Sequence, residues 1–130
     1  MNAPQDAQTV ADVSADTRRA TLLAGLAAIL PDAAVLWRAE DTVPYECDGL
    51  AAYRQVPDAV VLPDTEDQVC AVLRLCHELG VPVVPRGSGT SLSGGAMPIA
   101  GGLVLSLAKF KRILSVDPYS RTAVDRKSTV

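Results

Sequence analysis

The hydrophobic and polar positions divide the chain into a helical N-terminal part and a strand-rich remainder. Residues 1–15 are small and polar, a composition typical of disorder. From Asp16, alanine and leucine dominate as far as Pro31, which predicts a helix that Asp16 caps and the proline ends. The sequence from there to residue 56 has no sustained period, so we expect an irregular connection with a short strand or a helical turn.

Three short apolar runs predict buried strands. They are DAVVLP (58–63), VPVVP (81–85) and GLVLSLA (102–108). Because a helix is predicted between the first two, we expect a βαβ unit, in which these strands form a parallel pair joined by a right-handed crossover. Further on, RILSVDP (112–118) and RTAV (121–124) alternate about a turn, which predicts a hairpin.

The segment between the first two strands has a clear helical signal. Thr65 and Gln68 have the spacing of a capping box, and Gly80 followed by Pro82 ends the helix. The side chains with the spacing of one buried helix face are Val69, Val72, Leu73, Cys76 and Leu79.

A glycine-rich loop joins the second predicted strand to the third. Its residues 87–95 read GSGTSLSGG, with four glycines and four hydroxyl side chains. Glycines tolerate positive φ and let a ligand approach the backbone, and successive N–H groups in such a loop form an anion-binding nest. Arg86, at the entrance, would add a positive charge. The loop leaves the end of a parallel strand, where open α/β sheets bind ligands, so the pattern favours a phosphate or pyrophosphate site over a simple wide turn.

Two common nucleotide-binding motifs do not match this loop. A Walker A loop needs a lysine after a glycine, and no lysine follows any glycine here. A dinucleotide fingerprint needs a third glycine where Leu92 stands, and it needs a helix directly afterwards. The remaining interpretation is a pyrophosphate held by the loop backbone alone.

Composition and charge exclude several other classes. The 130 residues carry a formal net charge of −3, which argues against a nucleic-acid partner or an anionic membrane surface. The longest apolar stretch is far shorter than the roughly 20 residues of a transmembrane helix. The three cysteines lack CxxC spacing, so we expect buried or partly buried free thiols, no metal site and a cytoplasmic protein.

Two stretches together resemble a known family. PVVPRGSGTSLSGGAMP is similar to the pyrophosphate loop of FAD-linked oxidases of the vanillyl-alcohol oxidase type, which share a PCMH-type FAD-binding domain. With PYECDGLAAYRQVPDAVVLP, the resemblance is to the flavin-binding component of bacterial glycolate oxidase and to its D-lactate dehydrogenase relatives. It implies an α+β (α/β) fold: the first subdomain of a PCMH-type domain, a small parallel sheet with a βαβ unit, incomplete here.

The resemblance also implies where FAD binds. Gly94 and Gly95 would close the loop near the flavin. Family members with covalent flavin often carry a histidine where this sequence has Thr90, and the only histidine is His77 in a helix, so we expect noncovalent FAD. No catalytic residue or metal ligand is expected. The residues that would bind the cofactor are Arg86, Gly87, Ser88, Gly89, Thr90, Ser91, Gly94 and Gly95; Tyr45, Glu46 and Asp48 are expected to stabilise a turn.

The activity implied is oxidation of a 2-hydroxy acid, of the glycolate or D-lactate type, to the 2-oxo acid by a full-length flavoenzyme. Further subunits of the glycolate oxidase type would be partners, which would bring the protein to the inner face of a membrane. The alternative is a noncatalytic module that binds a nucleotide or a protein partner.

The resemblance divides the chain into three parts. Residues 1–15 are a disordered N-terminus, residues 16–56 a helix and an irregular connection, and residues 57–130 the N-terminal part of the FAD-binding domain. Since family members are several hundred residues long, we expect a truncated product, a frameshifted product or a part of a longer chain. Alone it should be inactive, with a sheet that has an exposed apolar face and an open edge.

Overall fold

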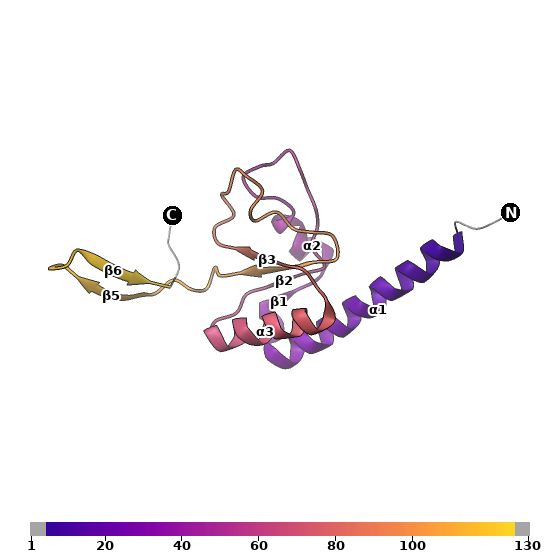
Figure 1. Ribbon diagram of the computed structural model, residues 1–130, viewed down its shortest axis with the longest axis horizontal. Helices are drawn as coiled ribbons and strands as arrows, with labels where there is room; N and C mark the ends of the chain where they lie inside the picture. Colours follow the sequence, from indigo (N-terminus) through magenta and orange to yellow (C-terminus); the bar gives the residue numbers. More distant parts are fainter. Residues whose placement is uncertain (1–4, 127–130) are drawn as a thin grey trace.

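The computed structural model describes residues 5–126 as a four-stranded sheet between a layer of two helices and a layer of loops (Figure 1). A separate two-stranded hairpin projects from one end. In chain order the elements are α1 (Gln5–Ile29), η1 (Asp32–Ala34), β1 (Val35–Leu36), α2 (Ala39–Thr42), η2 (Val43–Tyr45), β2 (Ala59–Val61), α3 (Glu66–Leu79), β3 (Val83–Arg86), β4 (Leu103–Ser106), β5 (Ile113–Asp117) and β6 (Thr122–Asp125).

The three predicted strands are present and parallel, but their order differs from the prediction. The sheet order is β1-β2-β4-β3, so β4 lies between the two strands expected to pair with each other. Pro85 in β3 gives a physical reason, because proline has no N–H to donate and favours an edge strand. The uninterrupted apolar run of β4 takes the centre instead, where all four of its residues are buried. The hairpin of β5 and β6 is confirmed.

Side chains of alternating strand residues bury both faces of the sheet. Ala59 and Val61 of β2 and Leu103 of β4 pack with Leu22 and Leu26 of α1 on the helix side. On the other side, the buried side chains Val60, Val84 and Val104 contact Leu36 and Tyr45.

The predicted exposed apolar face is therefore wrong for the sheet. The irregular segment 37–56 and the glycine loop fold over this second face (Figure 1). The open edge is present at β3, which pairs only with β4 among the described residues. Large apolar side chains are exposed on the hairpin instead, for example Ile113 and Val116.

The first helix is longer than the sequence pattern indicated. α1 begins at Gln5, so Asp16 lies inside the helix rather than at its cap, and the structure differs from the predicted disorder of residues 5–15. The sequence has no proline between Gln5 and Pro31, so no residue in this stretch prevents one continuous helix. Residues 1–4 of the predicted disordered segment lie outside the described residues.

α3 has the predicted ends, and its buried face differs from the prediction only at Leu73. The Gln68 N–H donates to Thr65 Oγ1 at 3.2 Å, which completes the capping box, and Gly80 ends the helix with a φ of 64°. Val72 and Cys76 are buried as expected, whereas Leu73 is 45% exposed. Leu75 packs into the core instead, because α1 lies alongside α3 and Gly25 of α1 leaves space for the Leu75 side chain.

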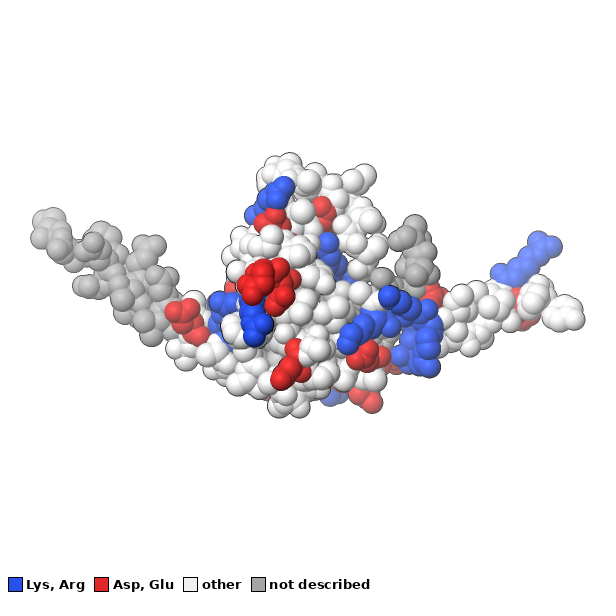
Figure 2. Space-filling view, turned by 180° about the vertical axis from the view of Figure 1, so that it is seen from behind, with Lys and Arg blue, Asp and Glu red and all other residues white. Residues whose placement is uncertain are grey.

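The surface of the described residues carries mixed charge and no apolar membrane segment. Figure 2 shows basic and acidic side chains interspersed on one face. No helix within residues 5–126 is long and apolar enough to cross a membrane, and no cluster of three metal-ligating side chains occurs there. The three cysteines are free, as predicted, but Cys70 is exposed rather than buried, because it lies on the outer face of α3.

Replacing Leu26 by alanine should destabilise the fold by about 2–5 kcal/mol, because the side chain is fully buried between α1 and the sheet. Urea unfolding followed by circular dichroism measures this. The exposed Ala24 on the same helix gives a control, since Ala24→Ser should change the free energy of unfolding by no more than about 0.5 kcal/mol. A cost below about 1 kcal/mol for Leu26→Ala would contradict the described core.

The turn of the hairpin should be sensitive to acid. The Ser120 hydroxyl, followed by the backbone N–H groups of Ser120 and Tyr119, holds the pKa of the Asp117 carboxyl below its ordinary value of 3.8. Because the pKa is lowered on folding, these bonds stabilise the turn above pH 3.8 and are lost as the pH falls through the folded-state pKa. Carboxyl-carbon NMR titration should show this lowered pKa, and Ser120→Ala should bring it back toward 3.8. A measured pKa of 3.8 or higher for Asp117 in the wild type would contradict the hydrogen bonds described for this turn.

Candidate functional site

The glycine loop runs from the end of β3 to the start of β4 without a helix. Gly89 has a φ of 74° and Gly94 a φ of 75°, a region that favours glycine, so two of the four predicted glycines adopt the conformation expected of them. Gly101, with a φ of 69°, makes a third such turn just before β4. The loop therefore changes direction at glycines while it crosses from the edge strand to the central strand.

The first half of the loop presents consecutive unpaired donors. Among the described residues, no protein acceptor pairs with the backbone N–H groups of residues 87–91. The Ser88 and Thr90 hydroxyl oxygens lie 3.3 Å apart, and both side chains are exposed. A run of unpaired N–H groups with adjoining hydroxyls is suited to the oxygens of a bound anion.

Arg86 ends β3 at the entrance of the loop, and its guanidinium group binds the segment 45–47. Its Nη1 donates to the Cys47 carbonyl oxygen at 2.8 Å, and its guanidinium carbon lies 5.4 Å from the centre of the Tyr45 ring. The guanidinium group also lies against Gly89: a Cβ there would be 2.2 Å from Arg86 Nη2. The side chain is drawn beneath the loop because the carbonyl and the ring of segment 45–47 give it partners.

This packing adds to the reason for glycine at position 89. The sequence alone suggested that its missing side chain leaves room for a ligand. The structure shows that the guanidinium of Arg86 already occupies the place of a Cβ, and that the backbone has positive φ. The positive φ therefore favours a glycine here, and a Cβ would also displace the end of the Arg86 side chain.

Asp48 stabilises a turn, as predicted, but it also reaches the loop. The side chain is buried, and its Oδ1 accepts from the Leu50 N–H at 2.9 Å. Its Oδ2 accepts from the Ala96 N–H at 3.4 Å, at the far end of the glycine loop. An Asp-Gly pair in an irregular stretch signals a turn, whereas nothing local in the sequence indicates a partner so far along the chain.

Other residues singled out in the sequence lie away from the loop. His77 is exposed in the last turn of α3, within the helical layer on the opposite face of the sheet. Burial raises the pKa of the Cys76 thiol on the same helix. Glu46 pairs with Arg54 within the connection, so it stabilises that segment as expected.

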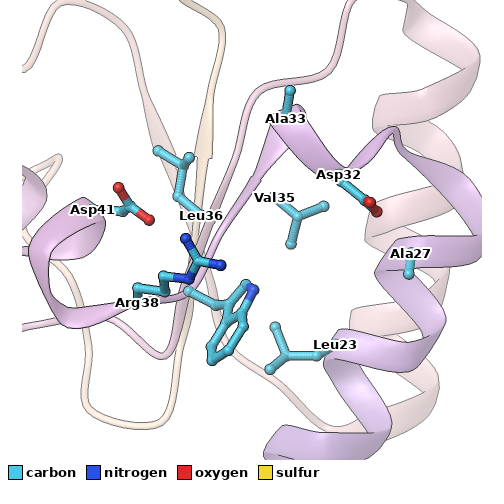
Figure 3. Close-up of a pocket in the computed structure, with 9 residues that line it drawn as sticks. Leu23, Ala27, Asp32, Ala33, Val35, Leu36, Arg38 and Asp41 are labelled. Atoms are coloured by element: carbon cyan, nitrogen blue, oxygen red, sulfur yellow. The ribbon is translucent and has the colours of Figure 1, made fainter.

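Two hollows in the described surface do not include the loop. The larger, of about 580 Å³, lies beside α1 and β1, with Leu23, Trp37 and Arg38 in its lining (Figure 3). The guanidinium of Arg38 lies 5.7 Å from the centre of the Trp37 ring. The second hollow, of about 490 Å³, lies between the start of α3 and the base of the hairpin.

Comparison with known proteins places these features in a family. The FAD binding domain family matches residues 57–125, more than half of the chain and the whole of the glycine loop. The glycolate oxidase subunit GlcD of Escherichia coli K12 is 49% identical over 108 residues, which are 83% of this chain and 22% of that protein. The D-lactate dehydrogenase of Anaerostipes hadrus is 41% identical over 71 residues, 54% of this chain and 15% of that protein. The chain thus spans about a fifth of the first of these relatives.

Solved structures share the fold. Alkyldihydroxyacetonephosphate synthase matches with a TM-score of 0.69 at 19% identity, over 78% of this chain and 21% of that chain. p-Cresol methylhydroxylase matches with a TM-score of 0.63 at 24% identity, again over 78% and 21%. The predicted α+β fold, the first part of a PCMH-type FAD-binding domain, is confirmed.

Gly89→Ala should lower the free energy of unfolding by at least about 1–2 kcal/mol, because alanine is strained at positive φ and its Cβ meets the Arg86 guanidinium. In an Arg86→Ala background the added cost should be smaller, since only the backbone strain remains. Urea unfolding of the wild type, Gly89→Ala, Arg86→Ala and the double variant measures the coupling free energy between the two positions. Gly95→Ala is the control, because its Cβ would meet only Ser91 Oγ at 3.5 Å. Equal costs in both backgrounds would show that Arg86 does not pack against Gly89.

Proposed function

The chain belongs to the FAD binding domain family of flavin-dependent oxidoreductases, and we propose that its glycine loop holds the pyrophosphate of FAD. The five unpaired N–H groups of residues 87–91 are the observation that carries this proposal. Gly94 and Gly95, in the second half of the same loop, are proposed to lie toward the flavin. The proposed binding residues are Arg86, Gly87, Ser88, Gly89, Thr90, Ser91, Gly94 and Gly95.

The chemistry of these groups matches a pyrophosphate. Its oxygens accept hydrogen bonds, and the loop offers backbone N–H groups together with the Ser88 and Thr90 hydroxyls. Arg86 is proposed to contribute its positive charge, as expected from the sequence: its guanidinium lies against Gly89, where the charge favours an anion on the loop while its hydrogen bond goes to Cys47. Bound FAD supplies the chemistry, as the acceptor of a hydride equivalent from the substrate.

The cofactor is proposed to bind noncovalently. Thr90 stands where a covalently linked relative often has a histidine, and the exposed His77 lies on a helix at the other face of the sheet. The loop residues therefore position FAD by hydrogen bonds and shape, without a covalent link.

The substrate class is proposed from the names of two relatives. We propose that the whole enzyme oxidises a 2-hydroxy acid of the glycolate or D-lactate type to the 2-oxo acid, since the names of two relatives specify these reactions. Glycolate oxidase-type subunits are proposed as partners because GlcD is named as a subunit, and a cytoplasmic site at the inner face of a membrane is proposed with them. The loop's residues bind and orient the cofactor, and no substrate-binding role is assigned to them. A noncatalytic nucleotide-binding module remains the second candidate, since the loop alone would serve it equally.

Titration of the ¹⁵N-labelled chain with ADP, which carries a pyrophosphate without the flavin, tests the proposal directly. The amide signals of residues 87–91 should shift, because their N–H groups gain an acceptor. Inorganic pyrophosphate should shift the same signals, whereas adenosine, which has no phosphate, should not. Shifts elsewhere with none in residues 87–91 would overturn the assignment of the loop. Flavin absorbance and turnover of glycolate or D-lactate by the whole enzyme separate an oxidoreductase from a noncatalytic module.

A further inference from the structure

We propose that residues 47–50, of sequence CDGL and here named the brace, position the glycine loop so that its N–H groups face the pyrophosphate. This inference rests on the proposed function, since it concerns the same loop. It assigns Asp48 and Gly49 a positioning role: they act on the cofactor only through the loop. Four contacts between the brace and the loop support it.

Two successive brace residues hold the two ends of the loop. At the entrance, the Cys47 carbonyl accepts from Arg86 Nη1 at 2.8 Å. At the far end, Asp48 Oδ2 accepts from the Ala96 N–H at 3.4 Å. Because these acceptors are adjacent in the chain, the entrance and exit of the loop are held at a fixed separation.

The third brace residue lies against the middle of the loop. A Cβ on Gly49 would be 2.8 Å from the Ser91 carbonyl oxygen and 3.0 Å from the Thr90 carbonyl oxygen. The next residue, Leu50, places its Cδ2 beside Gly94, 3.9 Å from the position of a Cβ there. No side chain other than hydrogen at position 49 allows the brace backbone to come this close.

The side on which the brace lies determines where the N–H groups of Ser91 and Leu92 point. In a trans peptide the carbonyl and the following N–H point in opposite directions, and the described residues have no cis peptide. Since the Thr90 and Ser91 carbonyls face Gly49, the N–H groups of the same two peptide units, which belong to Ser91 and Leu92, face away from the brace. The Ser91 N–H is the last of the five that are proposed to bind the anion.

The brace is itself fixed to the core. Tyr45, just before it, packs on the cluster of Val60, Val84 and Val104. Just after Tyr45, the Glu46 carbonyl accepts from the Gln55 N–H at 2.8 Å. Asp48 is 6% exposed and both its carboxylate oxygens accept backbone N–H groups, so its loss leaves buried donors unsatisfied. The loop is thereby ordered before a ligand arrives, which reduces the entropy lost on binding.

The test uses Asp48→Asn, because its expected effect opposes simple electrostatics. Asparagine removes a negative charge near an anion site, so charge alone would strengthen ADP binding. The positioning role predicts the reverse, a loss of about tenfold or more in ADP affinity, since one oxygen can no longer accept from the loop. Amide exchange of residues 87–96 should also accelerate. Asp64→Asn is the matched control: it removes the same charge from an exposed carboxylate and should change the affinity less than about twofold.

Gly49→Ala provides a second variant without any change in charge. Its Cβ pushes on the Thr90 and Ser91 carbonyls, so ADP affinity should fall here too. Unchanged or tighter ADP binding by Asp48→Asn with unaltered exchange overturns the positioning role. If the variants do not fold, exchange at the wild-type Ala96 amide decides: protection before ligand is added supports the brace, and rapid exchange overturns it. Absence of ADP shifts at residues 87–91 in the wild type would instead refute the proposed function itself.

Discussion

The parallel pairing of β3 with β4, without a helix between them, is the constraint on which this structure depends. To place the next strand parallel to the first, the chain must return to the end of the sheet at which the first strand began. Most proteins use a helix for this crossover. A helix satisfies its own backbone groups, whereas a loop must find partners elsewhere. Here residues 87–102 make the return as a loop over the sheet, and the segment that precedes β2 supplies part of what a helix would have supplied.

This constraint explains why small residues and one arginine meet at the same place. The loop turns at glycines with positive φ, and the brace approaches it closely only because Gly49 has no side chain. Arg86 ends the edge strand and, instead of extending into solvent, turns under Gly89 to the Cys47 carbonyl. One side chain thus closes the entrance of the loop and places positive charge beneath it.

The features that the sequence predicted correctly are those determined by near neighbours. Thr65 and Gln68 signal a helix start because their contacts are three residues apart, and the valine-rich runs signal strands because burial on both faces needs continuous apolar residues. The order of the strands depended on distant pairings, although Pro85 was a clue that β3 belongs at an edge. The contacts from Arg86 to Cys47 and from Ala96 to Asp48 join residues 39 and 48 positions apart, and no periodic pattern encodes such pairs. The loop was therefore identified from its composition, while the residues that hold it were not.

The brace also bears on how a loop without a helix or a lysine can hold an anion. A helix N-terminus orients several N–H groups because the helix fixes them, and its dipole adds favourable charge. A bare loop has the same donors but loses entropy when they are ordered, by about 1–2 kcal/mol for each residue fixed. Contacts that order the loop in advance remove that cost from the binding step. In the proposed site, the half-buried Arg86 would supply charge in place of the dipole. In the proposed site, the brace thus orients the N–H groups of the glycine loop, as a helix does in other nucleotide-binding folds.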